Sequence, residues 1–163
     1  KMIILGIDPG GRKCWYALVN FWGIPNTPTP QIMDCGILFD DSPIVTRLDW
    51  FKKMNNIHEY FKTLILEQKV EKVVIEKLYF TSKNQSNAEF VYGIRGALII
   101  FCVANNITFQ EIDPVQVKKY ITWNGKAEKK LVQKKVMQLF SLDELPQYND
   151  SADALGMAWI GQF

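Results

Sequence analysis

The chain has few of the residues that bind soft metals or build disulfide frameworks. Its 163 residues include one histidine, His58, and three cysteines, Cys14, Cys35 and Cys102, which lie far apart and form no CxxC pair. A disulfide scaffold or a thiolate zinc site is therefore not expected, and a reducing compartment is favoured. Any catalytic metal has to be held by carboxylates, which select hard ions such as magnesium or manganese.

The chain also lacks long hydrophobic runs and a strong charge of either sign. No apolar run approaches the roughly 20 residues that a membrane-spanning helix needs, and the first residues do not show the pattern of a signal peptide. Hydrophobic residues make up 48% and charged residues 22%, and the net charge is +2. This composition predicts a soluble, cytoplasmic protein without membrane contact, folded as one domain over residues 1–163.

Hydrophobic periodicity predicts an α/β fold with a mixed five-stranded sheet, three antiparallel strands followed by parallel ones. The strands are expected at 2–8, 14–22, 31–39, 72–76 and 107–112, and the helices at 45–68, 84–105, 114–120, about 131–140 and from about 150. The helix 84–105 is apolar on more than one side. One sheet face cannot cover so much apolar surface, so a second partner such as another subunit is expected.

Four carboxylates stand where strands end or helices begin: Asp8, Glu76, Asp150 and Asp153. Side chains at the ends of neighbouring strands can converge, and residues three apart in a first helical turn share a face. A cluster of four carboxylates is repulsive unless divalent cations fill it, so it indicates a two-metal site for phosphodiester hydrolysis. Each acid alone has a structural explanation, such as turn initiation at Asp8 or a favourable helix dipole at Asp150.

Positive charge is concentrated in one part of the chain. Between residues 118 and 135 there are seven lysines and one acidic residue, Glu128. The lysines are Lys118, Lys119, Lys126, Lys129, Lys130, Lys134 and Lys135. Such a stripe has the electrostatic character that a phosphate backbone requires. A solvated, lysine-rich helix face explains the same pattern equally well.

Five sequence blocks stand in a familiar order: LGIDPG, VIEKLYF, KNQSNAEFVYGIRGALI, VQVKKYITWNGKAEKKLVQKKV and NDSADALGMAWI. Together they resemble the RuvC family of Holliday junction resolvases and cover most of the chain outside about residues 20–70. The resemblance implies an RNase H-like fold, with helices flanking the sheet, and a homodimer. It also implies a magnesium-dependent endonuclease that resolves four-way DNA junctions by paired symmetric nicks, with two magnesium ions per active site and manganese as a substitute.

The resemblance implies roles for particular residues. It implies that the metal ligands are Asp8, Glu76, Asp150 and Asp153. It also implies that Lys118 and Lys129 lie near the scissile phosphate and that Lys129 has a catalytic role. Further DNA contacts are expected from Lys126, Lys130, Lys83 and Arg12, and from Tyr79 and Phe80, whose rings can stack on a base. Aromatic residues after a strand also occur as ordinary core residues, so stacking is one of two readings.

The helix 84–105 is the expected dimer interface. Its apolar residues Val91, Ile94 and Leu98 are expected to face the second subunit, and Gly93 and Gly96 to let the partner helix approach closely. The alternative is a monomer in which later helices of the same chain cover these residues.

The chain departs from the family pattern in three places. The segment GGRKCWYALV follows the first turn, Trp123 occupies a position often held by glycine, and residues 21–50 diverge most. These departures fit a divergent member, for instance from a phage or another virus, whose cleavage preference need not follow the cellular enzymes.

Other functions share parts of this pattern. Sugar kinases and actin-like proteins also begin with a strand and an Asp-x-Gly turn that binds phosphates, but they need a second lobe and a second such turn, whereas this chain has one DPG. An endonuclease that acts more broadly on forks, flaps and three-way branches stays open. A DNA-binding protein without catalysis is a further possibility, against which the four acids argue.

Overall fold

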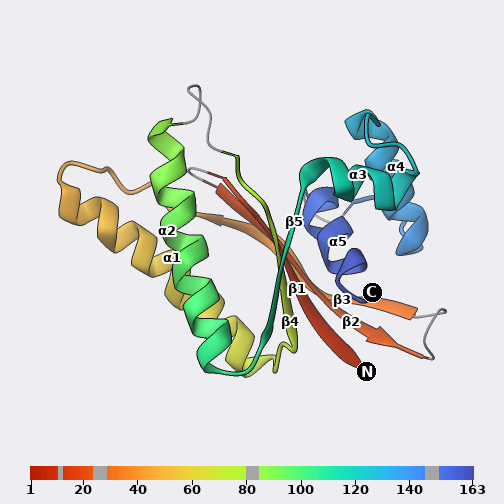
Figure 1. Cartoon of the computed structure of the whole chain (residues 1–163), viewed down its shortest axis with the longest axis horizontal. Helices are drawn as coiled ribbons and strands as arrows, with labels where there is room; N and C mark the ends of the chain where they lie inside the picture. Colours follow the sequence, from red (N-terminus) through yellow and green to blue (C-terminus); the bar gives the residue numbers. More distant parts are fainter. Residues whose placement is uncertain (11–12, 24–28, 80–84, 146–150) are drawn as a thin grey trace.

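A computed structural model of the chain describes residues 1–10, 13–23, 29–79, 85–145 and 151–163 (Figure 1). The strands are β1 (Met2–Pro9), β2 (Lys13–Trp22), β3 (Thr29–Phe39), β4 (Lys72–Glu76) and β5 (Thr108–Ile112). The helices are α1 (Arg47–Glu67), α2 (Gln85–Ala104), α3 (Pro114–Thr122), α4 (Lys129–Leu139) and α5 (Ser151–Ile160). Each predicted strand and helix is present, with small shifts at its ends. No helix within these ranges is long and apolar enough to cross a lipid bilayer.

The strands form one mixed sheet in the order β3-β2-β1-β4-β5. The pairs β1–β2 and β2–β3 are antiparallel. The pairs β1–β4 and β4–β5 are parallel, because a helix connects β4 to β5 and returns the chain to the same end of the sheet. The predicted arrangement of three antiparallel strands followed by parallel ones is therefore confirmed.

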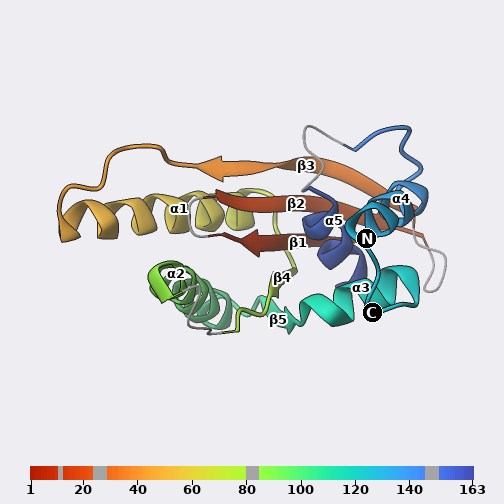
Figure 2. The same cartoon turned by 90° about the horizontal axis from the view of Figure 1, so that it is seen from above.

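Helices cover both faces of the sheet, with α1 and α2 on one face and α3, α4 and α5 on the other (Figure 1, Figure 2). Alternate residues of a strand point to opposite faces. In β1, Ile3, Leu5 and Ile7 are buried in the cluster under α1 and α2, while Ile4 is buried in the cluster under α5. The same alternation directs Asp8 to the face that α5 covers.

Two glycines let α5 lie directly on the sheet. A Cβ at Gly6 in β1 would overlap the carbonyl oxygen of Ala154 and lie 2.8 Å from the backbone nitrogen of Ala158. A Cβ at Gly161, just after α5, would lie 2.9 Å from a methyl group of Ile4. The end of α5 thus lies over the start of β1, so α5 runs antiparallel to β1 and its first turn lies at the end of the sheet that carries Asp8.

The helix α2 buries a different face from the one that a dimer could use. Val91, Ile94 and Leu98 are almost fully buried within their own chain, Ile94 and Leu98 in the core cluster between the sheet and α1. Gly93 faces α1, because a Cβ there would lie 2.6 Å from the sulfur of Met54. The prediction that Val91, Ile94 and Leu98 face a second subunit is therefore wrong. Helical spacing indicates that a stripe is buried, but it does not tell which neighbour buries it.

Candidate active site

Asp8 and Glu76 stand side by side at the ends of neighbouring parallel strands. The register pairs Ile7 of β1 with Ile75 of β4, and each acid is the next residue along its strand. Adjacent strands lie about 4.8 Å apart. Glu76 shares a face with Val74, which is buried in the cluster under α5, as Asp8 shares a face with Ile4. The two carboxylates therefore point to the same side of the sheet, toward the first turn of α5.

Asp153 reaches this place from α5. It lies in the first turn of that helix and is half-buried. Because α5 runs antiparallel to β1, its first turn lies over the strand ends that carry Asp8 and Glu76, and the negative charge of Asp153 acts on Glu76. The structure thus places three of the four predicted acids at the same end of the sheet. The fourth, Asp150, lies outside the described residues.

The charges around Glu76 perturb its titration. Burial, together with the nearby carboxylates of Asp8, Asp153 and Asp113, raises the pKa of Glu76 from its ordinary value of 4.5 to about 8, while the positive charge of Lys118 opposes the shift. A carboxyl group in a half-buried site among like charges holds its proton because the ionised form is poorly solvated and repelled. Such perturbation is typical of functional sites.

Asp113 is a member of this acidic environment that the sequence did not identify. It follows β5 and caps α3, accepting a hydrogen bond from the backbone N–H of Val115 at 2.7 Å and another from the hydroxyl of Tyr79. The register pairs Glu76 with Ile112, so Asp113 follows the neighbouring strand end. The available signal in the sequence was an acidic residue followed by proline, Asp113-Pro114, directly after a predicted strand.

The donor groups fit a hard divalent cation. They are carboxylate oxygens, the ligands that magnesium prefers, and a bound cation would relieve the repulsion that keeps Glu76 protonated. Among the described residues, no three histidine, cysteine or acidic side chains lie close enough together to complete a metal site. Asp8, Glu76 and Asp153 are therefore part of a candidate ligand set, to which the predicted Asp150 would add.

Among the predicted basic residues, Lys118 lies near enough to the acids for its charge to act on Glu76. It lies in α3, and its charge lowers the pKa of Glu76. The contact between α3 and α5 sets this position, since a Cβ at Gly156 would touch Val117 and Ile121 at 3.5 and 3.6 Å. Lys126 precedes α4 and Lys129 and Lys130 begin it, all exposed on the same helical layer. Arg12 and Lys83 fall outside the described residues.

Tyr79 lies beside the acids with half of its surface exposed, at 50%. Its hydroxyl donates a hydrogen bond to Asp113, and the ammonium of Lys77 lies 5.3 Å from the centre of its ring. These contacts hold the ring at the rim of an open pocket of about 640 Å³, lined by Lys77, Tyr79, Glu111, Asp113, Val115 and Gln116. The position suits the predicted contact with DNA. Phe80 is outside the described residues.

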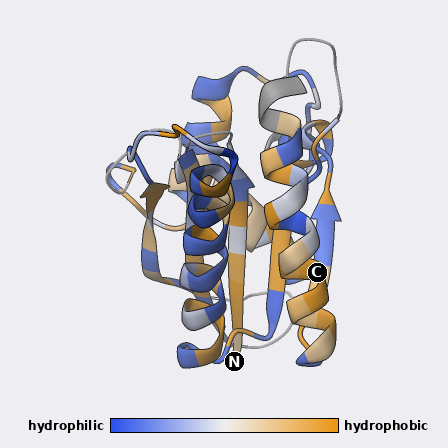
Figure 3. Cartoon of the chain, turned by 90° about the vertical axis from the view of Figure 1, so that its left-hand side faces the viewer, coloured by the Kyte–Doolittle hydropathy of each residue, from blue (hydrophilic) through white to orange (hydrophobic). Residues whose placement is uncertain are grey.

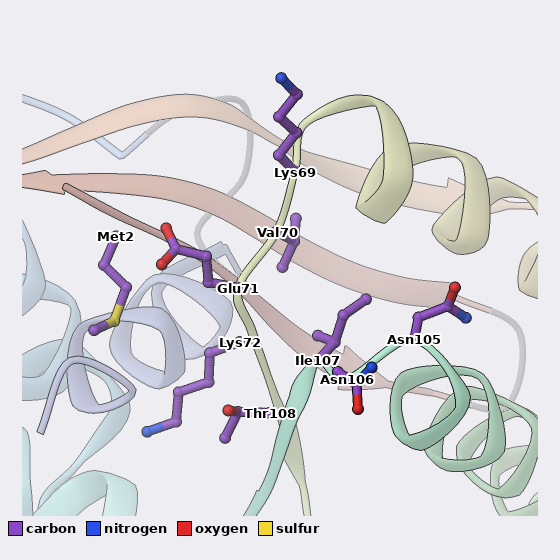
Figure 4. Close-up of a pocket in the computed structure, with 9 residues that line it drawn as sticks. All are labelled: Met2, Lys69, Val70, Glu71, Lys72, Asn105, Asn106, Ile107 and Thr108. Atoms are coloured by element: carbon purple, nitrogen blue, oxygen red, sulfur yellow. The ribbon is translucent and has the colours of Figure 1, made fainter.

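A second pocket, of about 500 Å³, lies at the opposite end of the strands from the acids (Figure 4). Met2, Lys72 and Thr108 line it, at the starts of β1, β4 and β5, together with polar residues of the preceding turns such as Asn106. The acids stand at the other ends of the same strands. Ligands of open α/β sheets bind at the carboxyl ends of strands, so this pocket is separate from the candidate active site.

Known proteins resemble the chain over nearly its whole length. The family model of RuvC, crossover junction endodeoxyribonuclease, matches residues 4–160. The crossover junction endodeoxyribonuclease RuvC of Natranaerobius thermophilus is 34% identical over 159 residues, which are 96% of this chain and 92% of that protein. The RuvC protein of Caldicellulosiruptor saccharolyticus is 35% identical over 159 residues, 96% of this chain and 90% of that protein.

Solved structures show the same architecture. The structure of Thermus thermophilus RuvC superimposes with a TM-score of 0.82 at 24% sequence identity, over 96% of this chain and 91% of that one. The same protein in complex with a Holliday junction substrate gives a TM-score of 0.78 at 22% identity, over 96% and 90%. This likeness confirms the expected RNase H-like fold. The match of the family model to residues 4–160 and the relatives at 34% and 35% identity show that the chain belongs to the RuvC family.

Proposed function

We propose that the protein is an endonuclease that resolves four-way DNA junctions by cutting two strands symmetrically. The observation that supports this most is the pairing of Asp8 with Glu76 on adjacent strand ends, below the first turn of α5 and beside Lys118. Acids and a lysine at one site suit a phosphodiester bond, because the acids hold metal and the lysine attracts the phosphate. The names of the relatives, crossover junction endodeoxyribonuclease, agree with this chemistry.

Endonucleases of this family depend on a metal ion, and we propose that this chain uses two magnesium ions, with manganese as a substitute. Asp8, Glu76 and Asp153 would hold them together with Asp150. When bound, the ions supply an activated water and stabilise the leaving oxygen. The protein's own part is to place the scissile phosphate: Lys118 beside the acids, and Lys129, with a catalytic role, at the start of α4.

The remaining predicted contacts belong to DNA on either side of this phosphate. Lys126 and Lys130 would contact the backbone from the surface next to α3, and Tyr79 would stack on a base at the rim of the open pocket. Arg12, Lys83 and Phe80 stay predictions from the sequence. All these groups belong to one nuclease domain over residues 1–163, and we expect it to act on DNA in the cytoplasm of a bacterial or phage-infected cell.

The active form is proposed to be a homodimer built on α2. The outward face of this helix is apolar: Ile100 and Val103 are 72% and 68% exposed, and Tyr92 lies on the same face. Figure 3 shows α2 as largely hydrophobic, in contrast to the hydrophilic outward side of α1. A Cβ at Gly96, in the middle of this face, would meet no described atom within 4 Å. A helix apolar on both sides is covered on both, and two equivalent sites suit paired cuts.

Cleavage of labelled DNA in magnesium tests the proposal. We expect cutting of a four-way junction, with no cutting of a linear duplex of the same sequence. Equal cutting of three-way branches and flaps would support the broader branched-DNA endonuclease instead. Binding to the four-way junction without any cutting, in magnesium or manganese, would contradict an enzymatic role.

A further inference from the structure

Trp123 is an exposed tryptophan in a backbone conformation that suits glycine. It ends α3 with φ 61° and ψ 11°, in the left-handed region, and its backbone N–H donates to the carbonyl of Lys119 at 2.8 Å. The side chain is 90% exposed. Left-handed backbone is unfavourable for a residue with a Cβ, and an exposed indole gains almost no burial. Trp123 thus combines an unfavourable backbone conformation with an exposed apolar ring, and backbone strain of this kind is typical of functional positions.

The turn that presents Trp123 is well fixed. The hydroxyl of Thr122 donates to the carbonyl of Lys118 at 2.8 Å, and the backbone N–H of Asn124 donates to the Thr122 hydroxyl at 3.2 Å. The N–H groups of Lys126 and Ala127 both donate to Asn124, at 3.0 Å. Such a turn fixes the backbone from which the indole projects before any partner binds, which lowers the entropic cost of binding.

The surroundings of Trp123 are cationic and lead to the acids. Lys118 and Lys119 precede it in α3, and Lys126, Lys129 and Lys130 follow it. Five residues of helix separate it from Lys118, a rise of about 7.5 Å. That distance corresponds to roughly two nucleotides along one strand, at about 3.4 Å each. With its scissile phosphate at the acids, a polyanion drawn to these lysines would come within reach of the indole.

We propose that Trp123 contacts DNA directly, its indole stacking on a nucleobase about two nucleotides from the cut. The inference rests on the proposed function. A tryptophan among lysines fits single-stranded or unpaired nucleic acid, because the lysines attract the backbone and the ring stacks on any base. The bases next to a branch point are the ones accessible for such stacking. Trp123 therefore positions branched DNA and does not touch the reacting atoms.

The variant Trp123→Gly separates this role from a structural one, because the two predict opposite results. Glycine adopts the left-handed backbone freely, so the melting temperature of the free protein should stay the same or rise. Stacking on a base contributes about 1 to 3 kcal/mol, so the dissociation constant for a four-way junction, measured in calcium, should rise about 5-fold or more. Trp123→Phe keeps a ring and should retain most of the affinity.

Two further measurements identify the contact. The slope of binding against salt should stay unchanged in Trp123→Gly, since no phosphate contact is lost, whereas Lys130→Ala should make it shallower by about one unit. A 2-aminopurine base two nucleotides from the cut should change its fluorescence on binding the wild-type protein and not the variant. An unbranched duplex should bind both proteins alike.

The outcomes that would contradict the proposal differ from those that would contradict the proposed function. Unchanged junction affinity of Trp123→Gly, with wild-type protein binding normally, overturns the contact and leaves the proposed function intact. A lower melting temperature with unchanged affinity assigns Trp123 a structural role and also overturns it. Equal loss on unbranched duplex refutes stacking at the branch. If the wild-type protein binds no branched DNA, the proposed function itself fails.

Discussion

Replacing Glu76 by glutamine should stabilise the metal-free protein while destroying its ability to bind metal. Burial and the neighbouring carboxylates raise the pKa of Glu76 to about 8 in the folded protein. In the unfolded chain the group titrates near 4.5. Between these values the carboxyl takes up a proton on folding, so its contribution lowers stability progressively as pH rises from 4.5 to 8. Glutamine has nearly the same shape and no proton to take up.

The size of the effect follows from the width of that pH interval. From pH 4.5 to pH 7 there are 2.5 pH units, each worth about 1.36 kcal/mol, which sets an upper limit of about 3.4 kcal/mol. Partial solvent exposure reduces this, so at pH 7 the free energy of unfolding of Glu76→Gln should exceed that of the wild type by about 1 to 3 kcal/mol. At pH 4 the group is protonated in both states and the difference should vanish.

Urea unfolding of both proteins in EDTA, at pH 4 and pH 7, measures the difference. Adding magnesium at pH 7 should then stabilise the wild type and leave Glu76→Gln unchanged, because a ligand that binds only the folded state adds stability. The reasoning is wrong if Glu76→Gln is less stable than the wild type at pH 7, or if the difference between them is the same at both pH values.

Three further predictions concern the site, the DNA surface and the dimer. Asp8→Asn and Asp153→Asn should each abolish cleavage in magnesium and leave junction binding within about threefold, measured by gel shift in calcium, because they remove metal ligands and not phosphate contacts; near-normal turnover of either variant would exclude that residue as a ligand. Lys130→Ala should reduce the salt slope of junction binding by about one unit, measured by titration at several salt concentrations, and an unchanged slope would remove Lys130 from the DNA surface. Ile100→Glu should give a folded monomer by light scattering, whereas Ile94→Glu, fully buried in the core, should unfold the chain by circular dichroism; a dimeric Ile100→Glu would exclude this face of α2.

The strands and helices could be predicted because their hydrophobic periodicity is local. The strand ends that carry Asp8 and Glu76 followed from the same pattern, since an apolar run that stops at a carboxylate marks the edge of a sheet. What brings the two acids together is the register of β1 with β4. That pairing joins residues far apart in the sequence, so local periodicity could not predict it. The prediction came from the family resemblance and from the general geometry of parallel sheets.

Other features depend on which surfaces meet, and the sequence does not encode this locally. A lysine in a surface helix normally extends into solvent, yet Lys53 is buried and its ammonium donates to the backbone carbonyl of Ser42 at 3.1 Å. The outward face of α2 was misplaced for the same reason: Val91 and Ile94 are as apolar as Ile100. The left-handed backbone of Trp123 was also unpredictable, because a tryptophan gives no signal for it.

Cleavage of a supercoiled plasmid that extrudes a cruciform tests the central claim most directly. A dimer with two equivalent sites cuts both strands across the junction within one binding event, which converts the circle to linear DNA. We predict linear product from the start of the reaction in magnesium, with ends that map to symmetric positions on the two strands. Nicked circles that accumulate before any linear DNA, or no cutting of the cruciform at all, would contradict the account.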